Sequence, residues 1–226
     1  MKQRTRIKIC GLTREADVDA AVQAGVDAIG FVLYPPSARV VSAERAAELA
    51  RRLPAFVTPV LLFVNEAEAV VRQAAAQVPG AWLQFHGDES PAQCATLARE
   101  LGRCWMRAAR IPSEPTPGTA PFDLLKYAHD YQGAQAILLD AHVEGYGGGG
   151  RTFNWSQLST NVNAHLVLSG GLNAANVTDG LRALRHCGRS LGVDVSSGVE
   201  VAKGLKSPEK IAQFVAAVRA HDAQAA

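Results

Sequence analysis

Short apolar runs alternate with segments of helical spacing along the chain. The runs are β-branched or otherwise apolar, have the length of buried strands and occupy residues 6–10, 28–34, 58–64, 81–85, 104–111, 135–140, 165–170 and 191–197. Between them, as in READVDAAVQAG and AERAAELARRL, apolar residues recur with the spacing of amphipathic helices. Strands that alternate with helices in this way predict parallel βαβ units.

Eight such units favour a closed (β/α)8 TIM barrel of the α/β class over an open doubly wound sheet. We expect one domain over residues 1–226, because no shift in composition marks a boundary. Ser90-Pro91 and Ser207-Pro208 carry helix-start signals. The prolines of 111–122 exclude a regular helix there, so the fifth helix is expected to be a short piece near 122–130.

Catalytic residues of such barrels lie at the carboxyl ends of the strands, and Cys10 stands at the end of the first. A cysteine is commonly a small buried hydrophobe. Here, however, Gly11 leaves open space in front of the thiol, and Lys8 shares its side of the strand and favours the thiolate. The other three cysteines fall within or beside predicted elements and are interpreted as structural: Cys94, Cys104 and Cys187.

Asp140 follows the apolar part of the sixth strand. A carboxylate at this point either caps a helix, anchors a loop or acts as an acid. Glycine-rich residues separate it from the next helix, so simple capping explains it poorly and we favour an acid. The rival carboxylate, Asp194, faces the same way as Ser196 but lies deeper, as expected of a hydrogen-bonded interior group.

Small residues follow the seventh and eighth strands, where (β/α)8 enzymes hold a phosphate on backbone N–H groups and a short extra helix. Two glycine turns are equally compatible with tight connections. Their occurrence after both of these strands favours a phosphate site and a phosphorylated metabolite as substrate. The candidate phosphate-binding residues are Gly170, Gly171, Ser196, Ser197 and Gly198.

The stretch EGYGGGGRTF, at 144–153, contains the spacing G-x-G-x-x-G. A dinucleotide fingerprint opens a helix directly after its strand and is followed about 20 residues later by an acidic residue. Here the strand ends five residues earlier, at Asp140, and Gly170 stands where the acidic residue is required. We therefore predict no cofactor loop but a glycine-hinged lid that closes over the site.

Six motifs resemble, in the same order, those of the phosphoribosylanthranilate isomerase family of tryptophan biosynthesis. They are KICGLTR, FVLYPPSARVVS, LQFHGDE, LLDAHVEGYGGGGRTFNW, LSGGLNAANV and GVDVSSGVE, and they extend over essentially the entire chain. The resemblance implies a cofactor-free Amadori rearrangement of N-(5-phosphoribosyl)anthranilate to 1-(2-carboxyphenylamino)-1-deoxyribulose 5-phosphate. By position, Cys10 corresponds to the general base and Asp140 to the general acid.

The resemblance also implies substrate-binding residues and two departures from the family pattern. Arg39 corresponds to the contact with the anthranilate carboxylate, and Gln84 and His86 belong to a matched motif, with His86 interpreted as a wall residue rather than a proton shuttle. Gly149 replaces the usual Thr or Ser, and Asn154 the usual Asp. Both departures lie in the LLDAHVEGYGGGGRTFNW motif. Gly149 concerns the ordering of the closed lid, and Asn154 weakens an N-cap charge but keeps its hydrogen-bonding oxygen, so neither touches the acid or the base.

The acid and the base each place a demand on the site. A free thiol has a pKa of about 8.5 and is only a few per cent thiolate at neutral pH, so the pKa of Cys10 must be lowered by Lys8 or by the iminium charge of the substrate. A carboxylic acid that donates a proton at neutral pH requires partial desolvation or a neighbouring negative charge.

Composition excludes several other classes of protein. Apolar residues make up 48% of the chain, and 23 basic residues are scattered among 21 acidic ones, so neither disorder nor a nucleic-acid partner is expected. No apolar run is long enough for a bilayer and the N-terminus lacks a secretory apolar region, which indicates a cytoplasmic protein without a membrane partner. The spacing of the histidines indicates no metal.

Two alternatives remain beside this family. A related phosphoribosyl isomerase of histidine biosynthesis, or a dual-substrate relative, performs the same rearrangement, but Cys10 and the lack of an evident second phosphate loop argue against it. A non-catalytic phosphate-binding barrel has no reason to retain both Cys10 and Asp140. The pattern does not separate a monomer from a homodimer.

Overall fold

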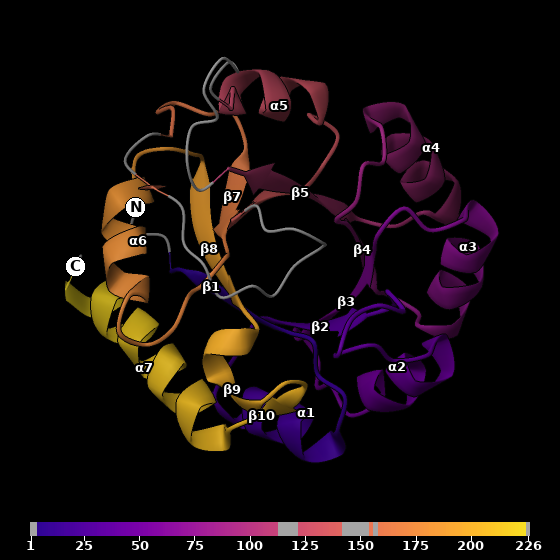
Figure 1. Cartoon of the computed structure of the whole chain (residues 1–226), viewed down its shortest axis with the longest axis horizontal. Helices are drawn as coiled ribbons and strands as arrows, with labels where there is room; N and C mark the ends of the chain where they lie inside the picture. The colour runs from indigo at the N-terminus through magenta and orange to yellow at the C-terminus, as the bar shows by residue number, and fades with distance from the viewer. Residues whose placement is uncertain (1–3, 113–121, 142–153, 156–157, 225–226) are drawn as a thin grey trace.

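Eight parallel strands close into a barrel in the computed structural model, which describes residues 4–112, 122–141, 154–155 and 158–224 (Figure 1). β1 pairs with both β2 and β8, which completes the ring, so the predicted fold class is confirmed. Every predicted strand is present, with ends within two residues of the expected ones. The strands are β1 Arg6–Cys10, β2 Ala28–Val32, β3 Thr58–Phe63, β4 Trp82–Phe85, β5 Trp105–Ile111, β6 Ala136–Ala141, β7 His165–Leu168 and β8 Ser190–Val195.

Helices surround the barrel. Those described are α1 Glu15–Gln23, α2 Ala43–Ala50, α3 Glu68–Gln77, α4 Pro91–Leu101, α5 Leu124–Asp130, α6 Val177–Leu184 and α7 Pro208–Gln224. The short α5 confirms the expectation set by the prolines before it. A 3-10 turn, η2 Ser197–Val199, and a hairpin of β9 Glu200–Ala202 and β10 Leu205–Lys206 follow β8. None of the helices in the described ranges is long and apolar enough to cross a membrane.

Alternate residues of each strand face opposite sides of the barrel wall. The outward set packs beneath the helices in the main hydrophobic core, which includes Ile7, Phe31 and Leu83. The inward set forms a separate apolar layer that includes Val60, Met106 and Leu138. Nearer the carboxyl ends of the strands the inward side chains become charged or polar: Lys8, Gln84 and Asp194 are all buried there.

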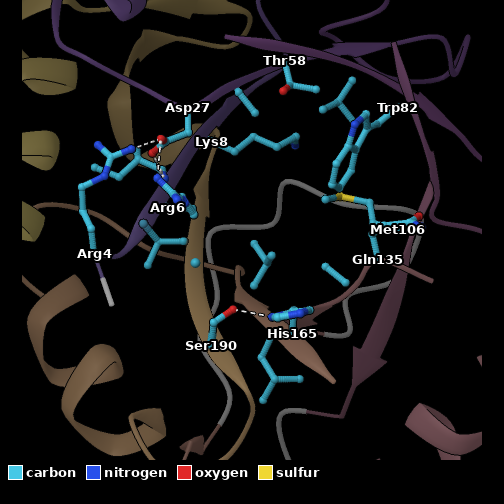
Figure 2. Close-up of a pocket in the computed structure, with 18 of the residues that line it drawn as sticks. Arg4, Arg6, Lys8, Asp27, Thr58, Trp82, Met106, Gln135, His165 and Ser190 are labelled. Atoms are coloured by element: carbon cyan, nitrogen blue, oxygen red, sulfur yellow. Dashed lines mark hydrogen bonds and ion pairs between the residues drawn. The ribbon is translucent and has the colours of Figure 1, made fainter. Parts of the chain in front are cut away.

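A cavity of about 740 Å³ opens at the other end of the barrel, among the amino ends of the strands (Figure 2). Trp82 and Met106 line it, and at its edge His165 Nδ1 lies 2.6 Å from Ser190 Oγ. Arg4 and Arg6, which also line the cavity, both pair with Asp27. This is the end of the barrel opposite the predicted active site, so the cavity is not the site that the sequence predicts.

The Ser90-Pro91 signal predicted from the sequence forms a side-chain cap at the start of α4, and this cap can be tested by mutation. Ser90 Oγ accepts a hydrogen bond from the Gln93 N–H at 3.3 Å, and Gln93 Oε1 accepts one from the Ser90 N–H at 2.9 Å. Because Ser90→Ala removes this cap, it is expected to lower the free energy of unfolding by about 1 kcal/mol in urea titrations.

The matched variant is Ala67→Ser, at the start of α3, where no side chain caps the helix. It is expected to raise the free energy of unfolding by an amount of the same order or smaller. If both substitutions change stability in the same direction, the account of these helix starts is wrong.

Candidate active site

The predicted site residues gather on one rim of the barrel. Cys10 is the last residue of β1, Asp140 lies near the end of β6 and His86 directly follows β4. Arg39 lies in the loop after β2, and the glycines and serines of the predicted phosphate site follow β7 and β8. The eight strands of the barrel are parallel, so these positions share the carboxyl end of the barrel. The predicted lid, including Gly149, lies outside the described residues.

The Cys10 thiol is buried against β2. Gly30 is its register partner, and a methyl group added at Gly30 would lie 2.7 Å from Cys10 Sγ and 3.0 Å from Lys8 Nζ. A residue larger than glycine at this position therefore meets both the thiol and the ammonium group. Of the other cysteines, Cys94 and Cys187 are buried, consistent with a structural role, whereas Cys104 precedes β5 and is exposed. The side chain of Cys104 is therefore not part of the core, and its structural interpretation has no support from burial.

Lys8 lies beneath Cys10 and forms an ion pair with Asp194, with Nζ 2.9 Å from Oδ1 and both side chains about 5% exposed. Asp194 is thus the hydrogen-bonded interior group that the sequence predicts. Burial raises the pKa of Cys10, and the positive charge of Lys8 opposes this effect without overcoming it. The negative charge of Asp194 raises the pKa further. The interaction with Lys8 favours the thiolate, as the sequence predicts, but it does not by itself bring the pKa of Cys10 below its ordinary value.

A buried chain of hydrogen bonds ends on Asp140. Gln84 Nε2 lies 3.0 Å from His86 Nδ1, and His86 Nε2 lies 3.0 Å from Asp140 Oδ2. With the Gln84 amide donating, Nδ1 is the acceptor and Nε2 carries the hydrogen that points to the carboxylate. Gln84 is fully buried, so it is connected to the rim through His86. This arrangement fixes the orientation of both the imidazole and the carboxyl group.

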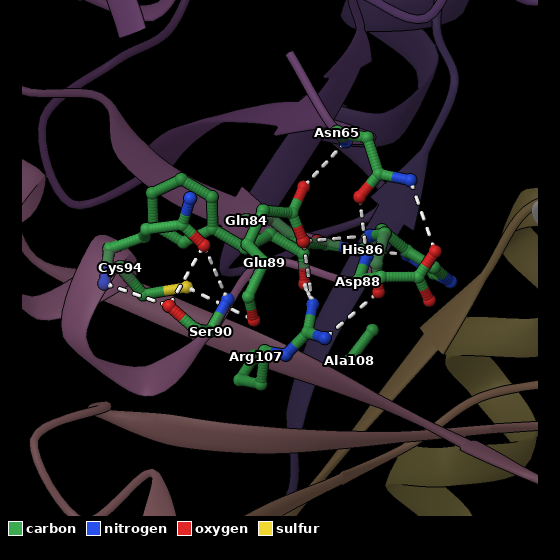
Figure 3. A network of polar contacts seen from close by, with 12 residues as sticks. Asn65, Gln84, His86, Asp88, Glu89, Ser90, Cys94, Arg107 and Ala108 are labelled. Atoms are coloured by element: carbon green, nitrogen blue, oxygen red, sulfur yellow. Dashed lines mark hydrogen bonds and ion pairs between the residues drawn. The ribbon is translucent and has the colours of Figure 1, made fainter. Parts of the chain in front are cut away.

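The loop that carries His86 is fixed from β5 (Figure 3). Arg107 donates to the carbonyl oxygens on either side of His86, to Phe85 O at 3.0 Å and to Gly87 O at 2.8 Å. Its charge is paired with Glu89 at 2.8 Å, and Glu89 in turn accepts the Gly87 N–H at 2.9 Å. Because both peptide groups around His86 are held, the imidazole has little freedom to leave Asp140.

The two loops of the predicted phosphate site lie in close contact. Gly170 has a φ of +78°, and a methyl group there would lie 3.0 Å from Asp140 Oδ1 and 2.6 Å from the Ala141 nitrogen. A methyl group at Gly198 would lie 1.8 Å from the carbonyl oxygen of Leu172. The structure therefore brings these two loops together next to Asp140, through contacts that only glycine permits.

Arg39 is paired within the protein. Its Nε and Nη2 donate to the two carboxylate oxygens of Glu200 at 2.7 and 2.8 Å. Lys206, whose side chain is fully buried, donates to the same carboxylate at 2.8 Å. Sequence reasoning assigned no role to Glu200, the partner of Arg39, or to Lys206, the second partner of Glu200. The signal was weak: the two residues lie near the ends of the short segment EVAKGLK, and their burial depends on a hairpin that no apolar pattern indicates.

Among the described residues, no group of three or more His, Cys, Asp or Glu side chains is placed to hold a metal ion. The chemistry that this rim offers is that of a thiol, a carboxyl group and several paired cations. A thiol and a carboxyl group are suited to moving protons, and the cations are suited to binding anions.

Comparison with known proteins gives a consistent result over nearly the whole chain. The family model of N-(5'-phosphoribosyl)anthranilate (PRA) isomerase matches residues 7–217. The N-(5'-phosphoribosyl)anthranilate isomerase of Methylibium petroleiphilum is 59% identical over 223 residues, which are 99% of this chain and 98% of that protein. The isomerase of Leptothrix cholodnii is 58% identical, over 98% of this chain and 94% of that protein.

Solved structures agree with the sequence relatives. The crystal structure of the Thermotoga maritima phosphoribosyl anthranilate isomerase superposes with a TM-score of 0.81 at 35% identity, over 96% of this chain and 99% of that one. A phosphoribosyl anthranilate isomerase in complex with reduced 1-(o-carboxyphenylamino)-1-deoxyribulose 5-phosphate has a TM-score of 0.78 at 32% identity, with the same coverage. The chain therefore belongs to the N-(5'-phosphoribosyl)anthranilate isomerase family.

Proposed function

We propose that the protein catalyses the Amadori rearrangement of N-(5-phosphoribosyl)anthranilate to 1-(2-carboxyphenylamino)-1-deoxyribulose 5-phosphate, a step of tryptophan biosynthesis. Membership of the isomerase family supports this reaction. The observation that carries it is the placement of a thiol, Cys10, and an oriented carboxyl group, Asp140, on the rim that also carries the two glycine loops. The rearrangement needs one general acid and one general base, and Asp140 and Cys10 can supply them.

In the first step, Asp140 donates a proton to the ring oxygen of the ribose, so that the ring opens to an iminium ion. The contact of His86 Nε2 with Oδ2 supports this role, because it fixes the plane of the carboxyl group. The close approach of Gly170 restricts the other side of the carboxyl group. Asp140 is also 7% exposed, so the proton transfer takes place in a site with little water.

In the second step, the Cys10 thiolate removes the C2′ proton, and the resulting enolamine tautomerises to the aminoketose. Burial raises the pKa of the thiol, so the thiolate needs a positive charge in addition to that of Lys8. The iminium ion formed in the first step supplies this charge next to the C2′ proton. Ring opening therefore comes before proton abstraction.

Two sets of residues bind the anionic ends of the substrate. Arg39 binds the carboxylate of the anthranilate ring, since a guanidinium group can hold a carboxylate by two parallel hydrogen bonds. The phosphate lies on the backbone N–H groups of the loops after β7 and β8, and Ser196 adds a hydroxyl group. Gln84 and His86 act on the substrate through the orientation of Asp140. The phosphate-binding set is Gly170, Gly171, Ser196, Ser197 and Gly198.

We also propose that residues 1–226 fold as one domain and that the protein acts in the cytoplasm. The family model extends over most of the chain, which supports a single barrel. All four cysteines are free thiols, which persist in a reducing compartment.

The first test follows the fluorescence decay of phosphoribosylanthranilate generated in place from anthranilate and the activated ribose. Wild type is expected to accelerate the decay, whereas Cys10→Ser and Asp140→Asn each lower kcat by at least about a hundredfold, the usual contribution of a general acid or base. Asp222→Asn, which removes a side-chain contact near the start of β1 at the opposite end of the barrel, is the control and is expected to retain the wild-type rate.

If wild type does not exceed spontaneous hydrolysis, this substrate is wrong, and the aminosugar phosphate of the histidine-pathway isomerase is assayed next. If only one of the two variants loses activity, the roles of acid and base are assigned wrongly.

The second test is the pH dependence of the free enzyme. Because burial raises the pKa of Cys10, thiolate-dependent inactivation by iodoacetamide is expected to rise with pH and to have its midpoint above about 8.5, the value of a free thiol. The rising limb of kcat/KM should share this midpoint, since kcat/KM reports the free enzyme. Cys10→Ser corrects for the other thiols, and a midpoint below about 8.5 would contradict the burial effect.

A further inference from the structure

The hairpin after β8 connects three parts of the rim. β9 and β10 place Glu200 and Lys206 opposite one another, and both residues are buried, with exposed fractions of 8% and 1%. At the hairpin turn Gly204 has a φ of +80°, and a methyl group there would lie 2.9 Å from the Ala38 carbonyl oxygen, next to Arg39. Thr13 Oγ1 donates to the Gly204 carbonyl oxygen at 3.1 Å. Figure 1 shows the hairpin beside α1.

Glu200 occupies one particular edge of the Arg39 guanidinium group. A guanidinium group has two edges that can each hold a carboxylate, one formed by Nε and Nη2 and one formed by Nη1 and Nη2. Glu200 takes the first of these, at 2.7 and 2.8 Å. Nothing within the described ranges accepts a hydrogen bond from Nη1, so the second edge remains for a further carboxylate.

Lys206 connects the same carboxylate to the loop after β8. Its Nζ donates to Glu200 Oε1 at 2.8 Å, to the Ser196 carbonyl oxygen at 3.0 Å and to Ser196 Oγ at 3.1 Å. These bonds use all three N–H groups of the ammonium ion. Because Ser196 Oγ accepts this bond, its own hydrogen is directed elsewhere and is available to a ligand oxygen.

The charges of this cluster leave a single positive charge. Arg39 and Lys206 are cations and Glu200 is an anion, and all three side chains are at most 11% exposed. Burial acts to raise the pKa of Glu200, but the hydrogen bonds from Arg39 and Lys206 hold it below its ordinary value. The carboxylate is therefore charged at neutral pH, and the cluster is matched to one further negative group.

We propose that Glu200 and Lys206 are positioning residues for the two anionic ends of the substrate. Glu200 fixes Arg39 so that its Nη1–Nη2 edge receives the aryl carboxylate, while Lys206 fixes Ser196 in the phosphate loop. The hairpin thereby sets the separation of the two anion sites. This inference rests on the proposed function, since it takes phosphoribosylanthranilate as the substrate.

The test compares two substrates, phosphoribosylanthranilate and its carboxylate-free analogue made from aniline, in wild type and Glu200→Gln. With Glu200→Gln, KM for phosphoribosylanthranilate is expected to rise about tenfold or more, the loss of a hydrogen bond between charged groups, with a smaller change in kcat. The analogue has no carboxylate to misplace, so its kcat/KM is expected to change by less than about threefold. Glu200→Asp retains the charge and is expected to restore part of the preference, measured as the ratio of kcat/KM values, for phosphoribosylanthranilate over the analogue.

A role in net charge alone predicts the opposite sign. Loss of the Glu200 charge makes the cluster more positive, so KM for phosphoribosylanthranilate would fall. The double variant Glu200→Gln/Lys206→Met keeps the single positive charge of the cluster. It replaces Glu200→Gln in the same comparison if that single variant does not fold. It is expected to show the same loss of preference for phosphoribosylanthranilate over the analogue. Because Ser196 loses its partner Lys206, the inhibition constant for inorganic phosphate is also expected to rise.

Asp222→Asn is the matched structural control. Asp222 accepts hydrogen bonds from Thr5 Oγ1 at 2.6 Å and from Arg219 at 3.2 Å, near the start of β1 and away from the rim. It is expected to lower the melting temperature and to leave the ratio of the two substrates unchanged. If Glu200→Gln also leaves this ratio unchanged while wild type is active, the positioning role is wrong. If wild type itself is inactive on phosphoribosylanthranilate, the proposed function fails, and this inference with it.

Discussion

A charge buried inside a barrel requires a partner of opposite charge. This requirement determines which side chains meet at the carboxyl ends of the strands. Lys8 reaches across to Asp194 from the neighbouring strand, and Arg39 and Lys206 share the carboxylate of Glu200. The partners of each pair come from different strands or loops. Each ion pair therefore also connects two segments of the chain. The bonds that compensate the desolvation of these charges hold the rim of the barrel in one arrangement.

The spaces between these pairs are kept open by glycine. Gly30 leaves room for the thiol of Cys10 and the ammonium group of Lys8, Gly170 for the carboxyl group of Asp140, and Gly11, with a φ of +74°, for the side chain of Arg39. At each position a methyl group would lie 3.0 Å or less from a neighbouring heavy atom. The reactive groups thus lie against backbone that is already in place before a ligand binds, which limits the reorganisation that a reaction requires.

The barrel was predictable because its strands are short runs of β-branched or other apolar residues, largely buried, and such runs stand out from the amphipathic helices between them. The positions of Cys10 and Asp140 on the rim follow from that pattern, and their roles remain predictions. The raised pKa of Cys10 was not predictable, because it depends on burial and on the sharing of Lys8 with Asp194. The Glu200–Lys206 pair was hidden as well, since a hairpin of this length carries no periodicity.

The contact between Gly198 and the Leu172 carbonyl oxygen has a consequence for protein engineering and for evolution. The loop after β7 and the loop after β8 touch through the main chain, so neither can be lengthened or replaced without refitting the other. Exchange of a single βα unit with another barrel therefore stops at this boundary. A laboratory that transplants this part of the rim into another barrel has to move the last two units together, as one cassette.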